Sequence, residues 1–171
     1  MPLTAAEALR QEFDESFALP FRATDGDTED LLAIVVGRRH YALRVTELGG
    51  VAAGRRVTRV PSADSTLWGL IGVRTLPVPL YDLARLLGEE APSEPPRWVA
   101  LSAGSAPVGL AFGALEGHLR LPRPALETAG RGLVACVIRE AYGLRSVIDV
   151  PGAVRALRQP SERPAASGKE P

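Results

Sequence analysis

An internal repeat constrains the fold of this chain more than any other feature of its sequence. A shift of 67 residues brings the two halves into step, and apolar runs, turns and a helical stretch recur in the same order. Each copy has about 60 residues, which is marginal for independent stability, so we expect the copies to pack over a shared apolar seam. The matched pairs include Ala33 with Ala100, Gly37 with Gly104, Leu43 with Leu110, Leu48 with Leu115, Gly50 with Gly117, Leu80 with Val147 and Asp82 with Asp149.

Short apolar runs punctuated by Gly and Pro predict about ten β-strands. The first run, 31–36, is closed by a predicted hairpin turn at 37–40 and returns over 41–45. Two stretches are helical instead, 82–87 and 150–158, and Asp82 and Asp149 lie where an N-cap is expected. The pattern is typical of an all-β protein built of barrels. The remaining predicted strands lie near 51–60, 67–73, 76–81, 97–102, 107–112, 117–121, 132–139 and 142–148.

The flanks differ from this central region. Residues 1–30 carry eight acids against Arg10 and Arg22. Within them, 4–17 predicts a short amphipathic helix that begins with a capping box and is followed by an acidic flexible stretch. Residues 159–171 have the composition of a disordered tail. The expected division of 31–158 is a first barrel at about 31–88, a linker at 89–96, a second barrel at about 97–149 and a closing helix at 150–158.

The chain lacks the residue patterns of common enzymes. It contains no phosphate-binding loop, dinucleotide fingerprint, nucleophile elbow or zinc-protease motif. The single cysteine, Cys136, lies in an apolar run and is read as a core residue, and the two histidines, His40 and His118, are far apart. We therefore expect no catalysis, no cofactor and no metal. No apolar run is long enough to span a bilayer and no secretion signal is visible, so a cytoplasmic location is expected.

Nucleic acid is an alternative partner, because small β-barrels bind it. The candidate patch is Arg55, Arg56 and Arg59. Aromatic residues make up only 5% of the chain and none interleaves with these arginines in the sequence, as a base-stacking platform requires. The acidic N-terminal segment would also repel phosphate. This interpretation is the less favoured one.

The middle of the chain carries a family signature. Residues 69–83 read Gly-Leu-Ile-Gly-Val-Arg-Thr-Leu-Pro-Val-Pro-Leu-Tyr-Asp-Leu, which resembles the CheW pattern G-x-I-N-L-R-G-x-x-x-P-V-x-D-L. The chain is similar to CheW coupling proteins over about residues 31–157. Further matches are Tyr41-Ala42-Leu43, Val60-Pro61, Arg85-Leu86-Leu87-Gly88 and Gly109-Leu110-Ala111-Phe112.

This resemblance implies two tandem five-stranded SH3-like barrels with short helices. It also implies a non-enzymatic adaptor of bacterial chemotaxis and motility, working with a two-component system. The expected partners are the cytoplasmic tip of a chemoreceptor (a methyl-accepting chemotaxis protein) and the regulatory domain of a CheA-type histidine kinase, with other CheW-like proteins as a further option. An alternative within the same fold is an accessory protein that binds a receptor or another CheW but not the kinase.

The resemblance also assigns residues. Arg74 matches the arginine on which family function most depends, and we expect it on a strand, with its guanidinium either free for a partner or paired internally with a carboxylate. For the seam between barrels we expect apolar residues that a single small barrel would struggle to cover: Val45, Leu48, Val51, Leu115 and Leu119. The chain departs from the family at four positions: Gly50, Gly72, Thr75 and Gly113 stand where Glu, Asn, Gly and Asp are usual.

Overall fold

The structure is a computed structural model that describes residues 28–141 and 143–159. The helix predicted at 4–17 and nearly all of the predicted tail at 159–171 lie outside these residues. The first strand begins at Thr28, so residues 28–30, expected to belong to the flexible segment, are part of the sheet instead.

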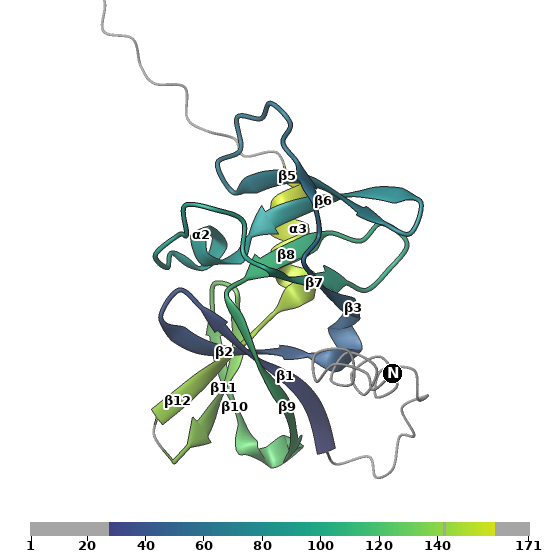
Figure 1. Cartoon of the computed structure of the whole chain (residues 1–171). Coiled ribbons are helices and arrows are strands. Elements are labelled where there is room, and N and C mark those ends of the chain that lie inside the picture. Colours follow the sequence, from purple (N-terminus) through teal and green to yellow (C-terminus); the bar gives the residue numbers. More distant parts are fainter. Residues whose placement is uncertain (1–27, 142, 160–171) are drawn as a thin grey trace, which may run out of the picture.

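The strands of the described residues form two six-stranded sheets, which confirms the all-β fold class (Figure 1). Each sheet has one strand more than the five expected. Sheet A, drawn lower in Figure 1, has the order β10 (Leu126–Arg131), β11 (Val134–Glu140), β12 (Gly143–Ile148), β2 (Arg39–Arg44), β1 (Thr28–Val36) and β9 (Ala114–Pro122). Sheet B has the order β3 (Leu48–Ala53), β7 (Trp98–Ser102), β8 (Gly109–Phe112), β6 (Leu76–Asp82), β5 (Leu67–Val73) and β4 (Val57–Thr58).

The two copies of the repeat exchange their first hairpins. The hairpin β1–β2 of the first copy lies in sheet A with β9 to β12 of the second, and β7–β8 of the second copy lies in sheet B with β3 to β6 of the first. Two equivalent parallel pairings join the copies, β2 with β12 and β6 with β8. The expected division into barrels at 31–88 and 97–149 is therefore wrong for the two hairpins. A repeat presents matching strand partners in both copies, so its pattern alone does not say which copy a hairpin joins.

Short helices follow the last strand of each copy. α2 (Leu83–Leu87) and α3 (Val150–Arg158) confirm both predicted helices. Asp82 and Asp149 accept hydrogen bonds from backbone N–H groups of the first turns, as expected of N-caps. Gly88 ends α2 in the left-handed conformation with φ 71°. Two single 3-10 turns, η1 (Val45–Glu47) and η2 (Arg123–Ala125), connect strands. No helix among the described residues has the length and apolar character needed to cross a membrane.

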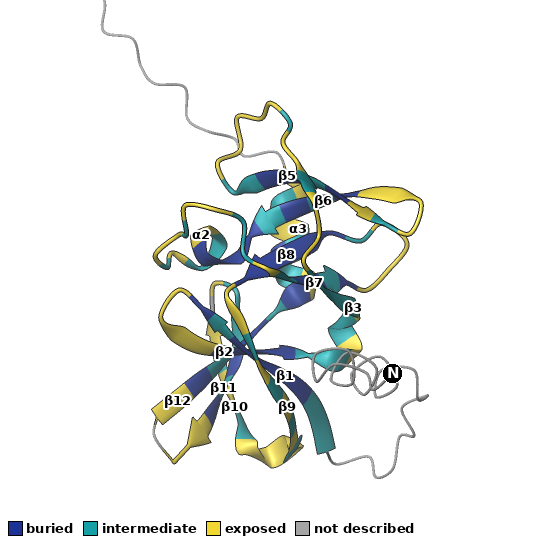
Figure 2. Cartoon of the chain, in the orientation of Figure 1, coloured by how far each residue is buried: buried dark blue, intermediate teal, exposed yellow. Residues whose placement is uncertain are grey.

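The largest apolar core lies between the sheets and is built mainly by the exchanged hairpins (Figure 2). Alternate residues of β1 face opposite ways, so Leu32 and Ile34 enter this inter-sheet core while Leu31 enters a second core within sheet A. A third core lies within sheet B around Ile71 and Leu80. Because both copies fill the inter-sheet core, neither can be removed without exposing it. Its buried members are Leu32, Ile34, Val36, Tyr41, Leu43, Leu83, Ala84, Ala100, Val108, Leu110, Phe112, Ile148 and Val150.

Candidate functional site

An apolar strip runs along η1 and β3 at the margin of the inter-sheet core. Leu48 and Val51 on β3 and Leu115 on β9 are half-buried and pack against that core. Val45, at the start of η1, is half-buried beside them in the chain. We call these four residues, Val45, Leu48, Val51 and Leu115, the seam strip. Leu119, the fifth residue expected at the seam, packs instead against the core within sheet A.

Gly50 lies in this strip at an irregularity of β3. The pairing of β3 with β7 shifts register between Leu48 and Gly50, and Gly50 has φ 152°. A side chain at that φ is strained, although a Cβ at Gly50 would meet no atom within 4 Å. Gly117 on β9, its repeat equivalent, has φ 149° beside a similar shift in the pairing of β1 with β9. Glycine at position 50 therefore leaves the strip flat and without a charge.

Arg74 occupies the tight turn between β5 and β6, not a strand as expected. Its φ is 55°, the left-handed region, and its side chain is exposed. Within the described residues it forms no ion pair or hydrogen bond, which argues against the internal-pairing alternative. Leu76, the first residue of β6, is 60% exposed. The hairpin thus presents a free guanidinium next to an apolar side chain.

The three other positions that differ from the family pattern lie at strand ends. Gly72 is exposed on β5, and a Cβ there would meet no atom within 4 Å. Thr75 is exposed in the Arg74 turn. Gly113 lies between β8 and β9, where a Cβ would come within 3.2 Å of the Val35 carbonyl oxygen. A side chain is therefore easily accommodated at position 72 and only with adjustment at 113.

Arg145 anchors a cluster that no motif in the sequence indicates. Its side chain, 9% exposed, donates to Glu140 Oε1 at 2.6 Å, to Glu116 Oε2 at 2.7 Å and to the Tyr41 carbonyl oxygen at 3.1 Å. His40 Nδ1 lies 2.9 Å from the other oxygen of Glu116. Burial opposes ionisation of Glu116, but its bonds to Arg145 and His40 prevail and lower its pKa. The cluster joins β2, β9, β11 and β12. His40 itself pairs with Val35 on the β-ladder and so lies in β2, not in the turn expected for it.

Arg44 anchors a second cluster at the other end of β2. Its guanidinium lies 2.6 Å from Glu29 and 3.2 Å from Glu47, and it donates to Cys136 Sγ at 3.3 Å. Glu47 also accepts the Val150 N–H at 3.0 Å, which ties η1 to the start of α3. Burial raises the pKa of both Glu47 and Cys136. Cys136 is 4% exposed within the core of sheet A, which confirms its interpretation as a core residue.

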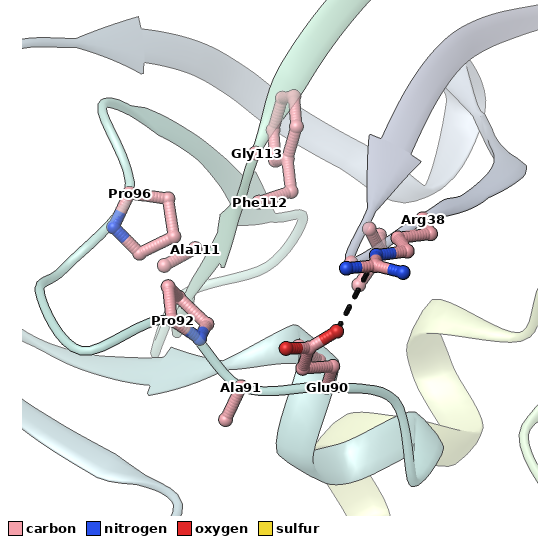
Figure 3. Close-up of a pocket in the computed structure, with 11 residues that line it drawn as sticks. Arg38, Glu90, Ala91, Pro92, Pro96, Ala111, Phe112 and Gly113 are labelled. Atoms are coloured by element: carbon pink, nitrogen blue, oxygen red, sulfur yellow. Dashed lines mark ion pairs between the residues drawn. The ribbon is translucent and has the colours of Figure 1, made fainter.

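The predicted linker at 89–96 is attached to the first hairpin. The Tyr41 hydroxyl donates to Glu89 Oε1 at 2.6 Å, and Arg38 lies 3.5 Å from Glu90. Beside these contacts is a pocket of about 390 Å³ whose walls are mostly apolar (Figure 3). The pocket is lined by Val36, Gly37, Arg38, Ala84, Glu90, Ala91, Pro92, Pro96, Ala111, Phe112 and Gly113. Its two charged side chains, Arg38 and Glu90, form an ion pair with each other.

The arginines considered for nucleic acid do not meet an open aromatic platform. Arg59 lies over the Trp68 ring at 5.9 Å, but Trp68 is only 9% exposed and its ring is shared with Arg85 at 5.3 Å. Arg55 and Arg56 are exposed, without an ion pair or hydrogen bond to any described residue. In the part of the chain that the structure describes, no group of His, Cys, Asp and Glu is arranged to hold a metal ion.

Comparison with known proteins agrees with this architecture. The family described as CheW-like domain matches residues 30–157. None of the curated protein sequences compared with the chain matches it. Among solved structures, the scaffolding protein TtCheW from Thermoanaerobacter tengcongensis is similar in fold, with a TM-score of 0.62 and 14% sequence identity over 70% of this chain and 88% of that chain. Because the family match spans most of the chain and coincides with both sheets, the chain belongs to the CheW-like domain family.

Proposed function

We propose that this chain is a cytoplasmic, non-catalytic scaffold that couples a chemoreceptor to a CheA-type histidine kinase. Membership of the CheW-like family supports this proposal, as does the similarity in fold to the scaffolding protein TtCheW. The observation that carries it is the presence of two surface features on a fold held by its own core. These are the seam strip at the junction of the sheets and the unpaired Arg74 on a projecting hairpin.

The seam strip suits an amphipathic helix. Its apolar side chains are only half-buried, and they lie beside a packed core that keeps them in place. A helix that presents apolar residues at three- and four-residue spacing can bury them against such a strip. The proposed occupant is the helical tip of a chemoreceptor. Its proposed contacts are Val45 on η1, Leu48 and Val51 on β3 of sheet B, and Leu115 on β9 of sheet A, with Gly50 allowing close approach. Leu119, half-buried and packed against the core of sheet A, would support β9 from behind.

Arg74 suits a partner with a carboxylate or carbonyl group. A guanidinium offers five donors in a fixed fork, and here it is held out by a tight turn without a described partner. Leu76 adds apolar area beside it. This combination of arginine and apolar contact is common at interface hot spots. Arg74, with the neighbouring Gly72, is the proposed contact to the kinase regulatory domain.

The test measures binding to the receptor and binding to the kinase separately; we call these the receptor arm and the kinase arm of the proposed function. Purified chain is titrated by calorimetry with a receptor tip peptide and, separately, with a kinase regulatory domain. We expect Arg74→Gly to weaken the kinase arm by about 10- to 100-fold, corresponding to a hot-spot residue, without lowering the melting temperature, because glycine accepts φ 55° more readily than arginine. Leu48→Asp should weaken the receptor arm alone. A fall in melting temperature with no change in either affinity would assign Arg74 to the architecture.

A second candidate is an accessory protein that binds receptors or another CheW but not the kinase. The glycines at positions 50, 72 and 113 favour it, since they leave out polar side chains that the family pattern has there. In the same titration this candidate would show binding to the receptor tip and none to the regulatory domain. Salt-sensitive binding of an oligonucleotide, with neither protein arm active, would instead favour the nucleic-acid interpretation.

A further inference from the structure

The described chain begins next to the seam strip. Leu31 on β1 pairs with Arg44 on β2, and the Glu29 carboxylate lies 2.6 Å from the Arg44 guanidinium. Val45, the first residue of the strip, follows Arg44 directly. Residues before Thr28 are therefore tethered beside the start of η1 and β3.

The predicted helix and strand β3 have similar lengths, and the chain that joins them is long enough to bring them together. A helix over residues 4–17 would be about 21 Å long at 1.5 Å per residue. The six residues of β3 span about 20 Å at 3.3 Å per residue. The ten residues between Phe17 and Thr28 have a root-mean-square span of about 17 Å as a flexible chain. Such a tether gives an effective local concentration on the order of millimolar.

The chemistry of the two surfaces is complementary. Leu9, Phe13 and Phe17 recur at four-residue spacing and form one apolar stripe when 4–17 is helical. β3 is the edge strand of sheet B. Its apolar residues are interrupted by Gly49 and Gly50, which have no side chains. A helix can therefore approach it closely.

The charge of the segment before residue 28 is opposite to that of the loop after β3. The segment before residue 28 has six acids against two arginines. Past the far end of β3, the exposed Arg55 and Arg56 make no ion pair with any described residue. A segment that starts at η1 and runs back along β3 brings its acidic helix toward this basic loop.

We infer that residues 4–17 dock as a helix along the seam strip and compete there with the helix of a partner. The competition rests on the proposed function, because it assumes that the partner uses this strip; the docking itself does not. The docked segment would lower the fraction of molecules open to a partner, and the apparent affinity would fall by that fraction. The chain would then carry its own competitor for the coupling site.

The docking is tested on the full chain by hydrogen exchange of the β3 amides, residues 48–53. We expect Phe13→Ser with Phe17→Ser to speed their exchange several-fold, with no change in the core strand β1. The matched control, Ala8→Ser with Gln11→Ser, alters the opposite face of the same helix and should leave exchange unchanged. We call the double substitution Phe13→Ser with Phe17→Ser the stripe variant. Equal β3 exchange rates in the natural chain and in the stripe variant would overturn the inference.

The competition is tested by titrating the same variants with a receptor tip peptide. The stripe variant should bind on the order of tenfold more tightly than the natural chain and the control. Faster β3 exchange without tighter binding would show that the segment docks but that the peptide binds elsewhere, which contradicts the competition and the proposed use of the strip. Failure of all chains to bind the peptide would contradict the proposed function, while the exchange experiment would still decide the docking.

Discussion

Asp82 and Asp149 cap two helices from equivalent places in the repeat. Asp82 Oδ1 accepts the Ala84 N–H at 2.9 Å, and Asp149 Oδ1 accepts the Gly152 N–H at 2.9 Å. Asp82 ends β6 and Asp149 follows β12, and each of these strands runs parallel to a strand of the other copy's hairpin. The equivalence of the two aspartates thus extends to the exchange of hairpins, and each sheet is complete only when both copies are present.

The exchange predicts that the chain unfolds as one unit. Fragments 1–93 and 94–171, separated within the linker, should each lack stable structure, because each leaves its hairpin without the strands it pairs with. Mixed together, they should restore the near-ultraviolet circular dichroism of the intact chain and a single cooperative melting transition. A fragment that folds alone, or two separate transitions in the intact chain, would contradict this prediction.

Gly69 and Gly72 make a matched pair on β5. Gly69 has φ 142°, and a Cβ there would lie 2.2 Å from the Thr58 carbonyl oxygen, so Gly69→Ala must push β4 away and strain the backbone. We expect it to lower the free energy of unfolding by about 2 kcal/mol or more. Gly72→Ala, in open space, should change it by less than about 0.5 kcal/mol. Urea denaturation measures both, and equal effects would show that the close approach of β4 is not the cause.

The local elements were predictable from the sequence because they depend on local signals. Two short apolar runs on either side of a turn predicted the hairpin of β1 and β2, and an aspartate before a short apolar helix predicted each N-cap. Pairings between distant strands leave no such signal. The Arg145 cluster joins charges from β9 and β12 that are separated along the chain, and nothing in the sequence near Arg145 indicates its burial.

The Arg74 turn shows the limit of turn rules in the same way. Two-residue hairpin turns usually place Gly or Asn where φ is positive, but here Arg74 and Thr75 occupy the turn. The strands that flank it are specified well enough to hold a non-glycine residue at φ 55°. Its exposure was therefore visible only in the structure.

Arg145→Met should destabilise the chain because it leaves Glu116 and Glu140 without their common partner. The carboxylates are 31% and 36% exposed, so we expect a loss of about 2 kcal/mol, below the cost of breaking a fully buried pair. Arg139→Met on the next strand is the control, since its pair with Glu127 at 3.8 Å is largely exposed and should contribute less than about 0.5 kcal/mol.

Because the pKa of Glu116 is lowered in the folded state, its contribution is present at neutral pH and is lost as pH falls through that lowered pKa. Denaturation of both variants at neutral and acidic pH would reveal a loss that shrinks in acid for Arg145→Met only.

Tyr41 predicts a loss of stability in alkaline solution. Burial, together with the hydrogen bond to Glu89, raises the pKa of Tyr41 from 10.0 to about 12. A raised pKa in the folded state means that the full contribution is present below pH 10 and is lost as pH rises from 10 toward 12. Tyr41→Phe should remove this part of the pH dependence and, at neutral pH, cost about 1–2 kcal/mol for the lost bond to a charged acceptor.

Burial also raises the pKa of Tyr81, so Tyr81→Phe serves as the control that keeps the Tyr41 contribution. Urea denaturation at a series of pH values would contradict the assignment if Tyr41→Phe lost stability above pH 10 as steeply as the natural chain does.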